Sequence, residues 1–235
     1  YQYTSRAGEK VWSLVVSDGI GTSDANGPGR TVVRDGTGAL VSDEAYVNDQ
    51  YGGGTAARLY YASPFLGGKI DATTRYGIGD FQGFDLFTSP DSRRLETFDS
   101  EDESFEMGVT YTRPLRANLS LETRLIHEQT TFDNVATFDE TMSGVAEPTV
   151  DFASEGDVSE SILRALLRWE KSPNLTFEAG GEVAYNMLDT TQALSVGGTP
   201  VPLPSASVKV EETRGELFGK STWRITPKLS LDGGL

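Results

Sequence analysis

Apolar and polar residues alternate along residues 163–187, on both sides of a four-residue break. Leu163 and Leu167 lie in one phase of this pattern, and Arg164 and Arg168 lie in the other. Successive side chains of a β-strand point to opposite faces, so a period of two predicts strands with one apolar and one charged face. The break reads Lys-Ser-Pro-Asn, which is typical of a turn. The pattern therefore predicts a long antiparallel hairpin, whose second arm exceeds the usual strand length of about five or six residues.

The same alternation recurs along the chain, and we expect about nine strands. They lie at residues 8–18, 52–62, 69–80, 104–113, 119–131, 163–170, 175–187, 209–224 and 229–235. Four short turns each carry one proline, at Pro64, Pro114, Pro173 and Pro227. Between them lie segments rich in glycine, acidic and small polar residues, which we expect to be long loops: 19–50, 81–103, 132–157 and 189–208. Strand, short turn, strand and long loop form a repeat of about fifty residues.

Strict alternation of short turns and long loops places all short connections at one end of a sheet. This is typical of transmembrane β-barrels, whose strands expose one face to lipid and the other to a wet lumen. Aromatic residues near strand ends fit the two interfacial girdles of such a barrel: Tyr61, Tyr111, Trp169, Phe177 and Trp223 at the short turns, and Tyr76, Phe105 and Tyr185 at the other end. The alternative is a soluble lipocalin-like barrel or sandwich, in which the apolar face would be the core.

Composition narrows the class of function. The 235 residues carry a net charge of -15 and no cysteine. The charge argues against nucleic acid as a partner, because phosphates require a basic surface. No run approaches the roughly 18 apolar residues of a transmembrane helix. No nucleophile elbow, phosphate-binding loop or metalloprotease motif is present, so we expect neither an enzyme nor a bound cofactor. We expect one domain over 1–235 and, because strand-like segments reach both ends, a piece of a longer chain.

Charged residues supply the candidate sites. One set lies in the phase opposite to the apolar residues and is predicted to face the lumen: Arg58, Arg75, Arg124, Arg164, Arg168, Glu178, Glu182 and Arg224. These residues could hold a plug by salt bridges, line a ligand path or only keep the lumen wall hydrated. The acidic run Asp99, Glu101, Asp102 and Glu103 offers carboxylates to a divalent cation, although a solvated loop is the favoured interpretation and no metal site is predicted. His127 is the single histidine, and its neighbour Glu128 points to the other face.

Three stretches resemble barrel strands and periplasmic turns of TonB-dependent outer-membrane receptors. They are Tyr-Thr-Arg-Pro-Leu from residue 111, Lys-Ser-Pro-Asn-Leu-Thr-Phe-Glu-Ala-Gly-Gly-Glu from residue 171, and Trp-Arg-Ile-Thr-Pro-Lys-Leu-Ser-Leu-Asp-Gly-Gly-Leu from residue 223. The resemblance implies part of a twenty-two-stranded antiparallel up-and-down barrel in a Gram-negative outer membrane. It also implies a plug domain, contact with membrane lipid and with the TonB complex, and uptake of a scarce small ligand such as an iron chelate (a siderophore). The sequence shows no TonB box, plug or full strand set.

Two other functions remain open from the sequence. One is a passive porin-type channel, and the other is a soluble β-rich binding or adhesion protein. In the receptor interpretation the four long loops would be extracellular and would capture the ligand.

Overall fold

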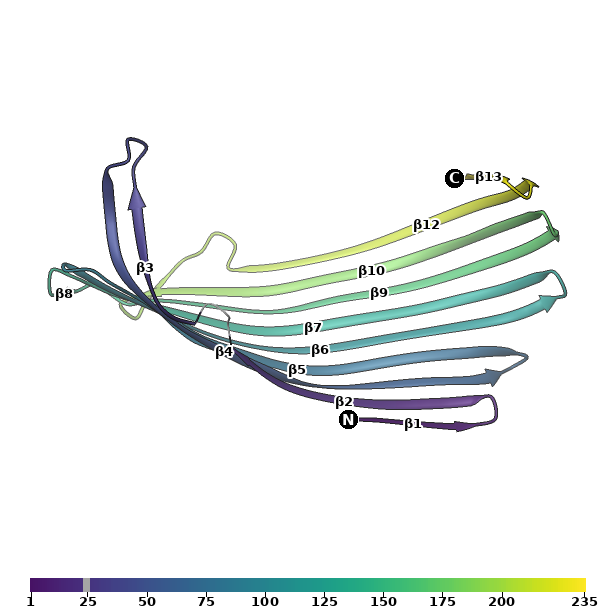
Figure 1. Cartoon of the computed structure of the whole chain (residues 1–235), viewed down its shortest axis with the longest axis horizontal. Helices are drawn as coiled ribbons and strands as arrows, with labels where there is room; N and C mark the ends of the chain where they lie inside the picture. The colour runs from purple at the N-terminus through teal and green to yellow at the C-terminus, as the bar shows by residue number, and fades with distance from the viewer. Residues whose placement is uncertain (23–25) are drawn as a thin grey trace.

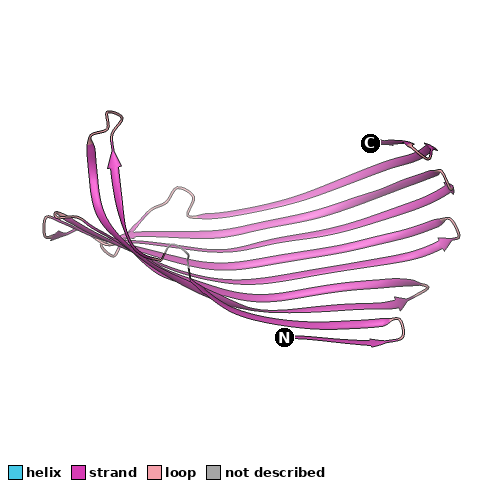
Figure 2. Cartoon of the chain, viewed as in Figure 1, coloured by secondary structure: helices cyan, strands magenta, loops and turns pink. Residues whose placement is uncertain are grey.

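The chain is built entirely from β-strands over the residues that the computed structural model describes, 1–22 and 26–235 (Figures 1 and 2). Thirteen strands lie in these residues: β1 Gln2–Ala7, β2 Lys10–Thr22, β3 Gly27–Arg34, β4 Leu40–Phe65, β5 Gly68–Thr88, β6 Ser92–Arg116, β7 Leu119–Met142, β8 Val145–Ala146, β9 Val150–Ser172, β10 Leu175–Val196, β11 Thr199–Val201, β12 Ser207–Thr226 and β13 Leu229–Gly234. Within the same residues no helix has the length and apolar character needed to cross a membrane.

All strands belong to one antiparallel, up-and-down sheet. Its order is β1-β2-β4-β5-β6-β7-β9-β10-β12-β13, while β3 pairs with β4, β8 with β7 and β11 with β10. The strands β1 and β13 lie at opposite edges and the sheet is open between them (Figure 1). The predicted fold class, all-β with antiparallel up-and-down strands, is confirmed.

The four turns predicted at the prolines lie together at one end of the sheet, with the β1–β2 turn (Figure 1). Pro173 and Pro227 lie in the turns themselves, whereas Pro64 and Pro114 lie in the last residues of β4 and β6. At the opposite end, hairpins close through two-residue turns with positive φ, such as Ser143–Gly144 (φ 51 and 78°) and Gly197–Gly198 (φ 58 and 74°). Such turns match the right-handed twist of the strands they join. The hairpin of β3 and the start of β4 bends away from the other strands (Figure 1).

The prediction of four long loops was wrong, because most of those residues continue the strands. The acidic run of 99–103 lies inside β6, paired with β5 on one side and β7 on the other. Glycine and acidic residues have low strand propensity, but that propensity depends on neighbours, and here two flanking strands supply every backbone partner. Gly83, inside one of the expected loops, illustrates the point: it lies in β5, so close to β4 that a Cβ there would clash with the carbonyl oxygen of Asp49. The strands β1, β3, β8 and β11 were not predicted.

The sheet is a single layer and has almost no core. In the described residues, the only hydrophobic side chains counted as buried are Ala62 and Ala184. The chain exposes 15604 Å², whereas a compact soluble protein of this mass exposes about 10,000 Å². A second layer that would cover either face of the sheet is therefore absent from the described residues.

Candidate functional site

The register of the central hairpin aligns its apolar residues on one face. In β9 and β10, Leu163 lies opposite Val183 and Leu167 lies opposite Ala179. We call this side the band face. The alternate residues form the other side, the ladder face, where Arg164 lies opposite Glu182. The hairpin predicted from the alternation is confirmed, but β9 begins earlier than expected, at Val150, and continues to Ser172, so the turn is only Pro173–Asn174.

The apolar residues of neighbouring strands continue the band face across the sheet. One row of directly paired residues crosses seven strands: Trp12, Tyr61, Ala72, Val109, Leu125, Leu163 and Val183. Large apolar side chains of the band face are open to solvent, with Leu163 52 %, Val183 54 % and Leu217 88 % exposed. A contiguous exposed apolar surface of this kind marks an interaction site in soluble proteins or a lipid-facing surface in membrane proteins.

Aromatic side chains border this apolar band at both ends. Near the short turns, the rings of Trp169 and Phe177 stack at 5.7 Å, and those of Phe65 and Tyr111 meet edge to face at 6.1 Å. Further along the strands, Tyr76 pairs directly with Phe105 on the same face. The aromatic residues predicted at the two ends of the strands therefore lie on the apolar side.

The height of the apolar band follows from the length of β10. From Leu175 to Met187 the strand advances twelve steps, or about 40 Å at about 3.3 Å per residue. A tilt of about 40°, usual for transmembrane barrels, shortens this to about 30 Å. That is the hydrocarbon thickness of a typical bilayer.

The ladder face carries rows of ion pairs at the same height. Glu182 lies 3.9 Å from Arg164 and 3.8 Å from Arg214, and Arg168 lies 3.6 Å from Glu178. Exposed pairs of this kind stabilise by about 0.2–1 kcal/mol each, so they orient the side chains more than they hold the fold. The guanidinium of Arg164 also lies 4.5 Å from the ring centre of Phe218.

All eight charged residues predicted to share a face do so. The register places Arg58 opposite Arg75, Arg124 opposite Arg164, and Arg168 opposite Glu178, and Arg224 alternates with Trp223 of the band face. Arg75 forms a further ion pair with Glu106 at 2.9 Å. The structure brings these residues to one surface, and their role toward a lumen or a plug stays a prediction.

The four acidic residues considered for a cation do not all lie on one surface. Asp99, Glu101 and Glu103 point to the band face, and Asp102 points to the ladder face. Over the ranges 1–22 and 26–235, no group of three or more His, Cys, Asp or Glu residues is arranged to hold a metal ion. His127 lies on the band face, 2.8 Å from the hydroxyl of Ser161.

The polarity of the sheet changes halfway along the strands, most clearly on the band face, a feature that the sequence prediction missed. The change follows a border row: Tyr76, Phe105, Gln129, Ser159, Met187 and Glu211. We call the part between the short turns and this row the near zone, and the part beyond it the far zone. The period of two continues unbroken through the expected loops, and this was the signal that could have revealed the far zone.

In the far zone the band face becomes acidic. Two adjacent rows there hold eight carboxylates, Asp18, Asp80, Glu101, Glu103, Asp133, Glu155, Asp157 and Asp189, with Lys209 among them. The ladder face becomes mixed there: aromatic and aliphatic side chains lie among polar ones such as Asp102 and Asp85, and the rings of Phe81 and Phe98 stack at 5.8 Å. A strand face that passes from lipid to water needs this kind of change.

A polar network anchors β4 to β5 in the far zone. Asp85 accepts hydrogen bonds from the Tyr46 hydroxyl at 3.0 Å, from the Asn48 amide and from the Gln50 amide at 3.5 Å. Asn48 is one of the few buried polar residues, 3 % exposed. Burial, together with the hydrogen bond to Asp85, raises the pKa of Tyr46. The network has the character of a structural clamp, because its groups partner one another.

Comparison with known proteins gives a weak structural likeness. No protein-family model matches the chain. No curated protein matches it either. Among solved structures it is similar to the ferric yersiniabactin uptake receptor FyuA from Yersinia pestis, with a TM-score of 0.42 and 9 % identity. The match covers 99 % of this chain and 43 % of that receptor, so this chain spans less than half of the receptor's length. The function proposed below is inferred from the geometry of the chain itself.

Proposed function

We propose that this chain is part of the wall of an outer-membrane β-barrel, with the band face of the near zone toward lipid and the ladder face toward the lumen. The apolar band carries the proposal, because it is continuous across seven strands, open to solvent and backed by rows of ion pairs. Lipid is the environment in which such a band needs no second protein layer. The acidic far zone then stands above the membrane.

Further strands at the two open edges would complete the barrel. The strand β13 covers only one end of β12, where it pairs with residues from Lys220 to Thr226. An antiparallel edge that is open offers its backbone groups to another strand, and a barrel is the arrangement that leaves no edge in the membrane.

The specific activity that we propose is energy-dependent, TonB-linked uptake of a scarce small ligand, such as an iron chelate. The support is the resemblance of three strand-and-turn stretches together with the ladder face, whose paired arginines and glutamates suit contact with a folded plug. The alternative is a passive porin, which would use the same wall around an open channel.

The orientation of the two faces can be tested by single-cysteine labelling, because the sequence contains no cysteine. A bimane probe on Leu167→Cys, in full-length protein reconstituted with nitroxide-bearing lipid, should be strongly quenched. The same probe on Arg168→Cys is the matched control, one residue away on the other face, and should be quenched little. Equal quenching at the two positions would refute the proposed orientation.

Channel recordings separate the two transport functions. Full-length receptor in a planar bilayer should conduct almost no current, because a plug fills the lumen. A steady open-channel conductance would favour the porin.

A further inference from the structure

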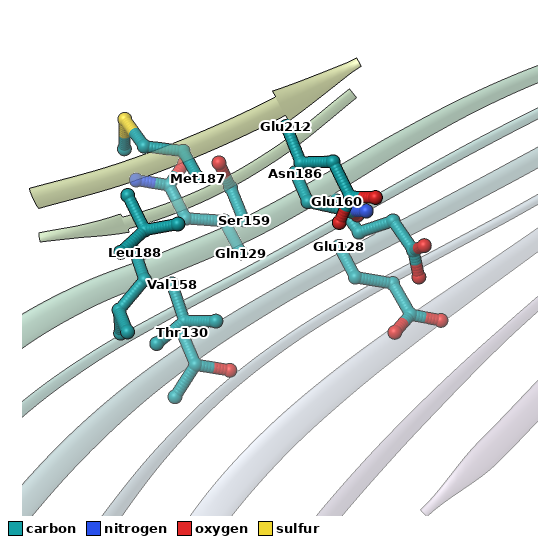
Figure 3. A pocket seen from close by; sticks show the side chains of 11 residues that line it. Glu128, Gln129, Thr130, Val158, Ser159, Glu160, Asn186, Met187, Leu188 and Glu212 are labelled. Carbon is teal, nitrogen blue, oxygen red and sulfur yellow. The ribbon is translucent and has the colours of Figure 1, made fainter. Parts of the chain in front are cut away.

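A hollow of about 430 Å³ lies on the sheet at the border between the near and far zones. Its walls come from β7, β9, β10 and β12, and its volume falls in the range of about 300–1,000 Å³ typical of small-molecule sites. Figure 3 shows its two sides: the carboxyl groups of Glu128, Glu160 and Glu212 gather at one side, and Val158 and Leu188 lie at the other.

The acidic side is one row of directly paired residues on the ladder face. Glu128 lies opposite Glu160, Glu160 opposite Asn186, and Asn186 opposite Glu212. Directly opposite side chains in antiparallel strands have Cβ atoms about 4.5–5.5 Å apart, and like charges at this spacing repel. The row therefore gathers negative charge at a cost in stability.

No basic side chain of the described residues neutralises the three glutamates of this row. None of Glu128, Glu160 and Glu212 takes part in an ion pair within 4.0 Å, whereas the next carboxylate of the row, Glu106, is paired with Arg75. The nearest arginine along β12, Arg214, is already shared between Glu182 and Glu216. The other carboxylates of the ladder face in the near zone are paired, so the hollow differs from the rest of that part of the wall.

The apolar side is the next row of the same face. Val158 lies opposite Leu188, and Leu188 opposite Val210. Val158 is 40 % exposed and Val210 51 % exposed. These aliphatic groups border the unpaired carboxylates directly, so a ligand on the hollow would meet both rows at once.

From this charge complementarity we infer that the hollow binds an organic cation with an apolar body. An ammonium or guanidinium group lies among Glu128, Glu160 and Glu212, and its hydrocarbon part lies on Val158, Leu188 and Val210. A positive head group offsets the repulsion within the row, and the aliphatic row excludes water from the chain behind it. The inference rests on the proposed function in one respect, because the ladder face must line a lumen that stays open to small solutes at the height of the border row, whether or not a plug blocks the lumen elsewhere.

Hexylammonium is the probe, titrated calorimetrically into full-length protein in lipid nanodiscs, with the heat from empty nanodiscs subtracted. We expect it to bind at least ten-fold more tightly than hexanol, which lacks the charge, and than methylammonium, which lacks the chain. The triple variant Glu128→Gln, Glu160→Gln, Glu212→Gln should lose at least ten-fold in affinity. Its melting temperature should rise, since the repulsion is removed.

The control variant carries the same change of charge on the opposite face: Glu101→Gln, Glu103→Gln, Glu155→Gln. It should bind hexylammonium as the wild type does. A second variant, Val158→Thr with Val210→Thr, should weaken hexylammonium several-fold and leave methylammonium unchanged, because only the apolar row is altered.

Two results would overturn the inference: equal affinity for hexylammonium and hexanol, or a glutamine triple variant that folds and binds hexylammonium as tightly as the wild type. The result of this binding experiment can be distinguished from a failure of the proposed orientation of the two faces. If only the inferred ligand is wrong, the difference in bimane quenching between positions 167 and 168 will remain. If the orientation is wrong, that difference will disappear.

Discussion

The near and far zones share the same strands, the same register and the same period of two, yet the band face is apolar in the near zone and acidic in the far zone. In β6 the band face carries Val109 and Met107 in the near zone, and Glu103 and Glu101 in the far zone. The backbone is continuous through the change, because β6 runs without a break from Ser92 to Arg116. Pairing geometry therefore sets which residues share a face, and the types of those residues set whether that face is apolar.

The two zones also differ in how they hold polar groups. The near zone uses exposed ion pairs on the ladder face, such as that of Arg168 with Glu178 at 3.6 Å. The far zone contains the Asp85 network, which includes the buried Asn48. Buried polar groups lose more when a partner is removed than exposed pairs do. Substitutions in the two zones should therefore have different costs.

The largest expected difference comes from placing a charge on the band face. Leu163→Arg, in the middle of the near zone, should destabilise the full-length protein in lipid vesicles by about 2–4 kcal/mol, because arginine would enter the hydrocarbon. The matched substitution Ala153→Arg lies on the same face of β9 in the far zone and should cost little. Urea titration of folding into vesicles measures both, and equal costs would mean that the two zones share one environment.

A medium effect is expected from the polar groups. Asp85→Ala removes the acceptor of Tyr46 and Asn48 and should lower the free energy of unfolding by about 1–3 kcal/mol, because the buried amide loses its partner. Glu178→Gln, in an exposed near-zone pair, should cost less than about 1 kcal/mol. The same urea titration compares them, and a larger loss for Glu178→Gln would reverse the contrast between the zones.

The smallest effect concerns pH at the tip of the β3–β4 hairpin. The Thr37 hydroxyl, 2.7 Å away, and then the Thr37 and Ala39 backbone N–H groups lower the pKa of Asp35. Because the pKa of Asp35 is lower in the folded tip than the ordinary value of about 3.9, the ionised carboxylate stabilises the tip at pH values above about 3.9. This stabilisation is lost as the pH falls through the lower pKa of the folded state.

The protection factors of the amides at the tip, corrected for the intrinsic exchange rate at each pH, should accordingly fall in acid, while those of the short turn at Leu66–Gly67 in the near zone should not change. Carboxyl NMR titration should show the Asp35 pKa rising toward its ordinary value in Thr37→Val. An unchanged pKa in that variant would show that the hydroxyl is not its main cause.

The near zone was predictable because local alternation and proline turns repeat along the sequence. The hairpin of β9 and β10 was correct down to the face of Leu167 and Arg168, and the shared face of the charged residues was also foreseen. The far zone was missed because its glycines and acidic residues were taken as loop signals. The carboxylate row of Glu128, Glu160 and Glu212 went unnoticed, since those residues lie on three different strands.

The sequence by itself determined the antiparallel sheet, the short-turn end and the partition of side chains between two faces, because a period of two and turn chemistry are local properties. Only the tertiary structure decided how far the strands extend and which residues become neighbours across them. Strand pairing joins positions about thirty residues apart, such as Glu128 and Glu160, and its register is fixed by all the turns and strands together. That register revealed the change of polarity along the band face and placed three unpaired glutamates beside an aliphatic row.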